Sequence, residues 1–343
     1  MRSRFTDIAG RRAMRGTRAG AVFSAAGLAV ALGSGAFLSP AGVGAAAGVG
    51  FGRPVAPIRG PGGAALRGPL NQIETSNWSG YAVANFETGA TYTGASGTWT
   101  VPPAQVAPGY SSAYSSSWVG IGGFCTNSTC TNVDSSLIQL GTDQFWSSSG
   151  GATYSAWYEL IPNGPVSISS LTINAGDIVT ASLTAGPSAT IAGSAVAPAT
   201  KPSGGGNGKG HGGGGGSSGQ TWTLQMSVTA PGATTHSWST TVTYDSSLLS
   251  GEWIEEAPTG CIGRHCEVLP LADYGTATFD LGTLTTSSGS SVSPALRQSE
   301  AIAMVDPAGE TSTPSALDGD ADGFSTCWAN GTTLSTDCLA SSS

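Results

Sequence analysis

The feature that most constrains the fold is a succession of short strand-like runs without a helical period. From about residue 72 to residue 343, segments rich in Thr, Val, Trp and Tyr alternate with Gly, Pro, Asn and Ser. Aromatic and β-branched residues favour extended strands, whereas Gly, Pro and Asn mark the turns between them. We predict strands at 76–83, 94–102, 115–123, 135–146, 153–162, 177–185, 221–230, 237–245, 251–258, 274–282, 300–306 and 324–329. Such a series fits one large antiparallel β-sandwich.

The first 48 residues have the layout of a secretory signal peptide. Arginines between residues 2 and 18 precede an apolar run from Ala19 to about Leu38 and then a stretch of small residues. Because this order of segments directs export, we expect 1–48 to be removed and the protein to be secreted. A retained membrane anchor is the alternative, although Gly and Ser interrupt the apolar run. Residues 49–70, rich in Pro and Gly, are expected to be a propeptide or disordered spacer.

Loss of the signal peptide together with residues 49–70 makes the chain strongly acidic. Nine of the thirteen Lys and Arg precede residue 70, whereas only one of the twenty-one Asp and Glu does. The remaining four cations and twenty acids give a net charge of −16. A surface of this sign repels nucleic acid and anionic membranes, so neither is an expected partner. A protein with so few cations has few salt bridges to lose in acid, and we expect it to tolerate low pH.

Six cysteines fall into three local pairs in the exported part. By spacing these are Cys125 with Cys130, Cys261 with Cys266, and Cys327 with Cys338. Local disulfides are expected in an oxidising compartment, although six cysteines allow fifteen pairings. A zinc site is the alternative, but the three histidines show no ligand spacing beyond that of His265 next to Cys266. We expect neither a metal nor a cofactor.

A glycine-rich run from Lys201 to Gly219 interrupts the strand pattern. Its composition is typical of a flexible linker. Because strand-like sequence resumes on both sides and no cysteine pair is split by the run, we interpret it as an insertion in a hairpin loop. The chain from 71 to 343 is then a single domain. Two domains divided at this run are the alternative.

The segment 251–258 concentrates carboxylates in a sequence that otherwise avoids charge. In an extended strand Glu252 and Glu256 share one face with Ile254, while Glu255 lies on the other. A carboxyl group held in partly apolar surroundings has a raised pKa, as catalytic acids and bases often do. The alternative is a solvent-facing edge strand guarded by acids.

Several familiar motifs are absent or incomplete. A serine peptidase with a GxSxG elbow is not indicated, and the strings that begin at Asp134 and Asp245 lack the glycine of an aspartic-peptidase loop. Residues 318–323 resemble the start of a calcium loop, but the twelfth position is Ala329 and not an acid, so a hairpin turn is favoured. Glycosylation sequons occur at Asn77, Asn127 and Asn330.

Six strings resemble those of the glutamic peptidases, the eqolisin family. They are Ser76–Gly80 (SNWSG), Trp118–Ile121 (WVGI), Leu137–Asp143 (LIQLGTD), Tyr154–Pro162 (YSAWYELIP), Ile173–Asp177 (INAGD) and Gly251–Glu256 (GEWIEE, with glycine in place of alanine). Any one string alone is weak evidence, but all six follow the family's order. The resemblance covers the chain from Ser76 to about Leu281.

The resemblance implies a concanavalin-like jelly roll, of the kind found in lectins and glucanases, and a pepstatin-insensitive acid endopeptidase. It would act on proteins or peptides, as a monomer. Matched position by position, the dyad is Gln139 and Glu256, and the residues that line the family's cleft are Trp78, Trp118, Asp143, Trp157 and Glu159. There are two departures, because Gly122 and Ser155 stand where family members commonly have acids.

For such a dyad we expect ionised Glu256 to take a proton from water and Gln139 to stabilise the oxyanion. A glycoside hydrolase that pairs Glu256 with Glu159 or Glu252 is an alternative. The second pairing is awkward, because residues four apart on a strand are roughly 13 Å apart at Cα and glycosidase carboxyls lie about 5–9.5 Å apart. A non-catalytic carbohydrate-binding sandwich that stacks its tryptophans on sugars is the third class.

Overall fold

The computed structural model describes residues 73–106, 108–186, 219–262, 265–292, 299–331 and 338. The predictions made for 1–48, for 49–70 and for the glycine-rich run up to residue 218 lie outside these residues. Regular structure in the described part is almost entirely strand, with one single-turn helix, α1 (Asn85–Thr88). None of the helical structure described is long and apolar enough to cross a bilayer.

The described residues form eighteen strands. They are β1 (Ile73–Thr75), β2 (Trp78–Ala84), β3 (Tyr92–Thr100), β4 (Ser112–Gly122), β5 (Leu137–Ser147), β6 (Gly151–Leu160), β7 (Val166–Ser167), β8 (Ile178–Ala185), β9 (Gln220–Thr229), β10 (Thr235–Tyr244), β11 (Ser250–Glu256), β12 (Thr259–Ile262), β13 (His265–Val268), β14 (Thr276–Thr286), β15 (Ser291–Val292), β16 (Ser299–Val305), β17 (Glu310–Pro314) and β18 (Phe324–Asn330). Each of the twelve predicted strands has a counterpart. The sequence missed six strands of two to five residues each, namely β1, β7, β12, β13, β15 and β17.

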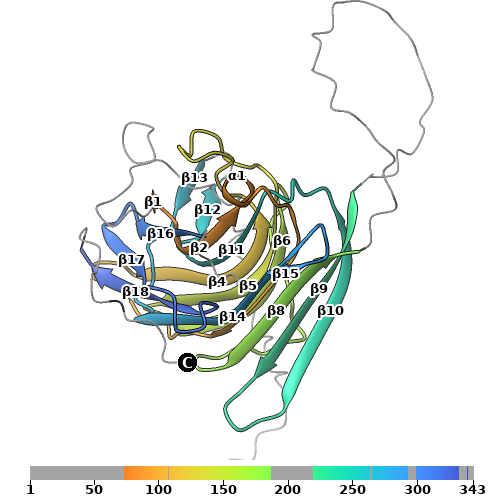
Figure 1. The fold of residues 1–343 in the computed structure, drawn as a ribbon. Helices are drawn as coiled ribbons and strands as arrows, with labels where there is room; N and C mark the ends of the chain where they lie inside the picture. Colours follow the sequence, from red (N-terminus) through yellow and green to blue (C-terminus); the bar gives the residue numbers. More distant parts are fainter. Residues whose placement is uncertain are drawn as a thin grey trace, which may run out of the picture. The chain divides into compact units, whose positions relative to one another are not determined.

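Sixteen of these strands belong to one sheet, ordered β10-β9-β8-β3-β14-β18-β17-β16-β2-β11-β4-β5-β6-β7, with β1 beside β16 and β15 beside β14. Every pairing is antiparallel except that of β1 with β16. Figure 1 shows β8, β9 and β10 as long neighbouring strands. In the sequence the glycine-rich run falls between β8 and β9, and these two strands pair directly.

The sheet folds back so that two parts of it face each other. The indole Nε1 of Trp253 on β11 donates to the Ser96 carbonyl on β3 at 2.8 Å, and Nε1 of Trp99 on β3 donates to Thr142 on β5 at 3.0 Å. Neither strand pair is hydrogen-bonded through its backbone, so these contacts join opposed layers. The predicted all-β antiparallel sandwich is confirmed.

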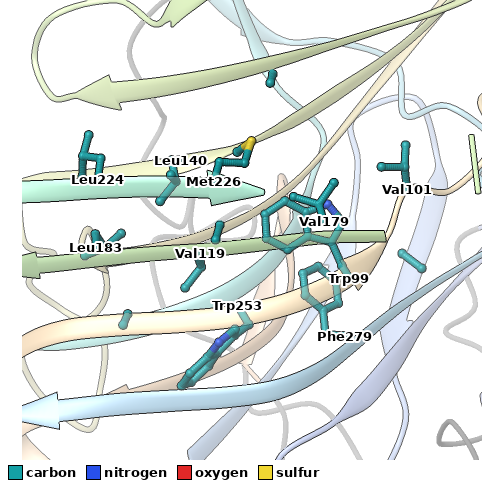
Figure 2. Close-up of a cluster of buried hydrophobic side chains, with 14 of the residues drawn as sticks. Trp99, Val101, Val119, Leu140, Val179, Leu183, Leu224, Met226, Trp253 and Phe279 are labelled. Atoms are coloured by element: carbon teal, nitrogen blue, oxygen red, sulfur yellow. The ribbon is translucent and has the colours of Figure 1, made fainter. Parts of the chain in front are cut away.

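The main hydrophobic core lies between the two layers (Figure 2). Side chains from both layers meet there, because alternate residues of each strand point inward. Those labelled in the figure are Trp99, Val101, Val119, Leu140, Val179, Leu183, Leu224, Met226, Trp253 and Phe279. Burial of each large apolar side chain contributes about 1.5–3 kcal/mol, so this layer supplies most of the driving force for folding.

A second apolar cluster covers the opposite face of the strands around β11. Its larger members are Ile73, Trp78, Phe124, Trp118, Leu137, Trp157, Ile254 and Ile302. As a result, all seven residues of β2 and of β11 are buried, whereas β8 and β9 alternate between buried and more exposed residues. The strands around β11 are therefore covered on both faces.

Two of the three predicted disulfides are present in the described residues, Cys125–Cys130 and Cys327–Cys338. For the third pair, the register of β12 and β13 sets Cys261 opposite Cys266, which is disulfide-bonded. No cysteine of the described part is free.

Candidate active site

β11 lies between β2 and β4, so it is an internal strand. The edge-strand alternative for 251–258 is therefore wrong. Ile254 belongs to the second cluster, and Glu252 and Glu256 share its face by the alternation of the strand. Glu255 lies on the core side and accepts a hydrogen bond from the Ser117 hydroxyl at 2.5 Å. The predicted division of this strand into two faces is confirmed.

Glu256 is buried and held by two donors. The Trp118 Nε1 donates to its Oε2 at 2.7 Å, and the Asn77 amide Nδ2 donates to its Oε1 at 3.4 Å. Burial raises the pKa of Glu256 to about 8, and the nearby Asp143 adds to this rise, while Trp118, Trp78 and Asn77 oppose it. Asn77 is itself fully buried, so its sequon is not an accessible glycosylation site.

Gln139 and Glu159 form a hydrogen-bonded pair on β5 and β6. They are partners in the strand register, and Gln139 Nε2 donates to Glu159 Oε2 at 2.8 Å. Burial raises the pKa of Glu159 to about 8, with the charge of Glu256 as the next cause. Glu159 therefore contacts Gln139 directly and lies close enough to Glu256 to feel its charge. Oε1 of Gln139 and Oε1 of Glu159 have no hydrogen-bond partner among the described residues.

The three tryptophans predicted for the site lie on the same face of the sheet. The rings of Trp78 and Trp118 meet edge to face with centroids 5.0 Å apart, and both side chains are 0 % exposed. Trp157 is 6 % exposed. Fully buried rings offer no open face to a sugar, so Trp78 and Trp118 do not support the carbohydrate-stacking alternative.

Asp143 lies on this face too, and the Ser116 hydroxyl donates to it at 2.5 Å. Burial raises its pKa to about 7. The structure thus brings all seven predicted dyad and cleft residues to one face of β2, β11, β4, β5 and β6. They are Trp78, Trp118, Gln139, Asp143, Trp157, Glu159 and Glu256.

Glu252 is a further buried acid that the sequence-based assignment of site residues left out. It is 0 % exposed, neither carboxyl oxygen has a described hydrogen-bond partner, and burial raises its pKa well above the usual range. The register aligns it with Gln139 across Gly120 of β4. Its place on the same face as Glu256 was the available signal. Its complete burial could not be inferred from the strand alone.

Two substitutions relative to the family pattern have structural settings. A Cβ added at Gly251 would lie 2.3 Å from Cδ2 of Leu284, so glycine is required unless that side chain moves. Ser155 is exposed and pairs with Asp143 in the register. The absence of an acid at position 155 therefore changes the rim of the site and not its buried part.

Two features of the described residues lie away from this face. Residues 318–323 form the predicted hairpin turn between β17 and β18, where Asp318 Oδ1 accepts from the backbone N–H of Asp322 and Gly323. A cavity of about 400 Å³ is lined by residues of β8, β9 and β10, among them Thr180, Gln225 and Trp238. None of its lining residues belongs to the candidate site.

Comparison with known proteins gives the site its context. The Peptidase A4 family matches residues 76–198. Aspergillopepsin-2 of Aspergillus niger is 27% identical over 274 residues, which are 74% of this chain and 79% of the relative. Scytalidopepsin B of Scytalidium lignicola is 32% identical over 142 residues, or 40% of this chain and 48% of the relative.

Two solved structures are also similar. Scytalido-glutamic peptidase with a transition state analog inhibitor is 25% identical, with a TM-score of 0.49, and SCP-B, an eqolisin with a bound tripeptide Ala-Ile-His, is 23% identical with a TM-score of 0.46. Each comparison covers 74% of this chain and 98% of the other.

A buried group of carboxyls and one carboxamide on a β-sandwich, together with relatives that are peptidases, defines the protein as a peptide-bond hydrolase. Over residues 76–198 its sequence is similar to the Peptidase A4 family, in agreement with the resemblance of its six strings. The matched segment 76–198 includes Gln139 and every predicted cleft residue, whereas Glu256 lies beyond it.

Proposed function

We propose that the protein is a secreted acid endopeptidase in which Gln139 and Glu256 form the catalytic dyad. The observation that carries the proposal is that Glu159 links the two dyad residues. It accepts a hydrogen bond from Gln139 at 2.8 Å, and the charge of Glu256 raises its pKa. Support for secretion comes from the signal-peptide layout of residues 1–48. Protein or peptide substrates follow from the family.

The raised pKa of Glu256 changes the mechanism expected from the sequence. With a pKa of about 8, Glu256 is a neutral carboxyl in acid and not the ionised base first expected. A neutral carboxyl can act at both oxygens. Its carbonyl oxygen accepts a proton from the attacking water, while its hydroxyl donates a proton to the oxygen of the scissile carbonyl. The product is a neutral gem-diol, and Glu256 ends with one proton, as it began.

The second step uses the same carboxyl. Glu256 donates its proton to the leaving nitrogen and takes one from a hydroxyl of the gem-diol, which gives an amine and a carboxylic acid. Gln139 has one N–H bound to Glu159 and a second N–H that can donate to the substrate oxygen as charge develops on it. Glu159 thereby orients the carboxamide. Because glutamine does not titrate, this donor is present at any pH.

The proposal is tested by assaying cleavage of a denatured protein from about pH 2 to pH 8, with and without pepstatin. Glu256→Gln removes the acid–base group and Gln139→Ala removes the oxyanion donor, so each should lower kcat by about 10²-fold or more. Asp320→Asn, which changes an exposed acid in the 318–323 turn, is the matched control and should leave kcat unchanged. Near-normal turnover in either dyad variant would show that the dyad is wrongly assigned.

A further inference from the structure

The end of β4 cannot carry the acid that family members commonly have at the position of Gly122. This glycine has φ +94°, and a Cβ added to it would lie 2.3 Å from the Ser136 carbonyl oxygen. The same Cβ would lie 3.1 Å from Oδ2 of Asp134. A carboxylate is therefore present beside position 122, but it comes from the loop that follows.

A disulfide and backbone hydrogen bonds within the loop 123–136 hold it in one conformation. The Cys125–Cys130 disulfide closes its tip, and an isolated bridge pairs Cys125 with Val133. The backbone N–H of Asp134 donates to the Phe124 carbonyl at 2.8 Å. These bonds place the Asp134 carboxylate in a defined position next to β4, and the side chain is only 9 % exposed.

The Asp134 carboxylate joins this loop to the connection between β10 and β11. Its Oδ1 accepts from the Ser136 N–H at 2.9 Å, and its Oδ2 accepts from the hydroxyl of Ser247. The Ser247 N–H donates in turn to the Ser136 hydroxyl at 3.0 Å. Three side chains from two distant segments thus form one closed hydrogen-bonded set, which we call the Asp134 clamp.

The clamp lies at the entrance to β5. The backbone N–H of Leu137, the first residue of β5, donates to the Tyr244 hydroxyl at 2.7 Å, and that hydroxyl donates to the Ile161 carbonyl at 2.8 Å. Tyr244 is the last residue of β10, and Ser247 lies three residues later in the connection between β10 and β11. Gln139 lies two residues after Leu137 on the same face of the strand. We therefore expect the position of this connection to influence the position of the Gln139 side chain.

We propose that Asp134 is a positioning residue for Gln139 that takes over the place of the acid missing at position 122. It acts by locking the start of β5 against the segment that leads into β11, so that the two strands carrying the dyad keep a fixed spacing. This inference rests on the proposed function of Gln139. It also gives the loop 123–136 a role, because the loop supplies Asp134.

The test compares substitutions on the two sides of the clamp. Asp134→Ala and Ser247→Ala should each lower kcat about 10- to 100-fold with KM changed by less than about threefold, because a displaced catalytic group slows the chemical step without weakening substrate binding. Asp134→Asn keeps an acceptor for the Ser136 N–H and should recover most of kcat. Ser247 is exposed, so its variant is expected to fold even where Asp134→Ala does not.

A double mutant separates positioning from a general structural role. In the Gln139→Ala background, Ser247→Ala should cause no further loss of kcat, because the residue through which the clamp acts is absent. Additive losses, or normal kcat in both clamp variants, would overturn the inference while leaving the peptidase proposal intact. Failure of the wild-type protein to cleave, or cleavage independent of Gln139, would instead overturn the proposed function.

Discussion

β9 and β11 are both internal strands of one sheet, yet they are built differently. In β9, buried residues such as Trp222 and Leu224 alternate with more exposed Thr, Gln and Ser. In β11 every residue is buried, including three glutamates. One buried face is enough to hold a strand in a sandwich, as β9 shows. The covered second face of β11 is therefore not required by the fold, which indicates a functional reason for its acids.

The contrast extends to the neighbouring strands. β8, β9 and β10 contain no Asp, Glu, Lys or Arg, whereas the strands around β11 bury Asp143, Glu159, Glu252, Glu255 and Glu256. Burial of an ionised carboxylate without a partner cation costs several kcal/mol, so these groups stay neutral where they can. The half of the sheet that contains the site is therefore destabilised when its buried carboxyls ionise, whereas the strands β8, β9 and β10 are not.

The largest effect predicted from this contrast is loss of stability as pH rises. Burial raises the pKa of Glu255 to about 7 and those of Glu159 and Glu256 to about 8. The folded state then binds protons more tightly than the unfolded state, so stability is full below about pH 4.5 and falls as pH rises through these values. Thermal unfolding should show a Tm that is much lower at about pH 8 than at about pH 4.

Glu255→Gln measures how much of this loss of stability at high pH comes from Glu255. The amide oxygen still accepts from Ser117 but does not titrate, so the variant should match the wild type at about pH 4 and be up to about 3 kcal/mol more stable at about pH 8. A Tm that is independent of pH in the wild-type protein would contradict the difference drawn between the two halves.

Next in size is the effect of replacing two tryptophans whose indole N–H groups donate hydrogen bonds on opposite faces of the sheet. Trp118 donates to Glu256 on the site face, and Trp99 donates to Thr142 in the core. Both Trp→Phe changes remove a buried hydrogen bond and should cost about 1–3 kcal/mol in urea unfolding. Only Trp118→Phe should also lower kcat, by roughly 10-fold or more, because it releases the catalytic carboxyl. Equal kcat losses in the two variants would contradict a site confined to one face.

A smaller effect is predicted for Asp143, whose charge raises the pKa of Glu256. In the proposed mechanism activity falls on the alkaline side as Glu256 loses its proton. Asp143 has the lower pKa, about 7, and so is ionised before Glu256. Asp143→Asn removes this negative neighbour, which lowers the pKa of Glu256 and moves the alkaline limb of kcat/KM to lower pH by up to about one unit. If Glu256 acted in its ionised form, its lowered pKa would instead move the acid limb of kcat/KM to lower pH and leave the alkaline limb unchanged.

The sequence predicted the strands and the site face because both depend on local patterns. Alternation along β11 is enough to separate Glu256 from Glu255, and the strings around Gln139 and Trp118 are contiguous. What it missed depends on residues far apart in the chain. The need for glycine at 251 comes from Leu284, and the contact of Asp134 with Ser247 joins positions more than a hundred residues apart. A local pattern carries no information on which distant side chain fills a given space.

The smallest predicted effects come from one substitution made in both halves. Ser117 on β4 is fully buried and donates to Glu255, whereas Ser227 on β9 is partly exposed. Ser117→Ala leaves a carboxyl oxygen buried without its donor and should cost about 1–3 kcal/mol. Ser227→Ala should change stability by less than about 0.5 kcal/mol. Urea unfolding of both variants at about pH 4 measures the difference while Glu255 is neutral. If the costs were equal, hydrogen bonds to the buried acids would add nothing to stability, and the second face of β11 would be held by its apolar cluster alone.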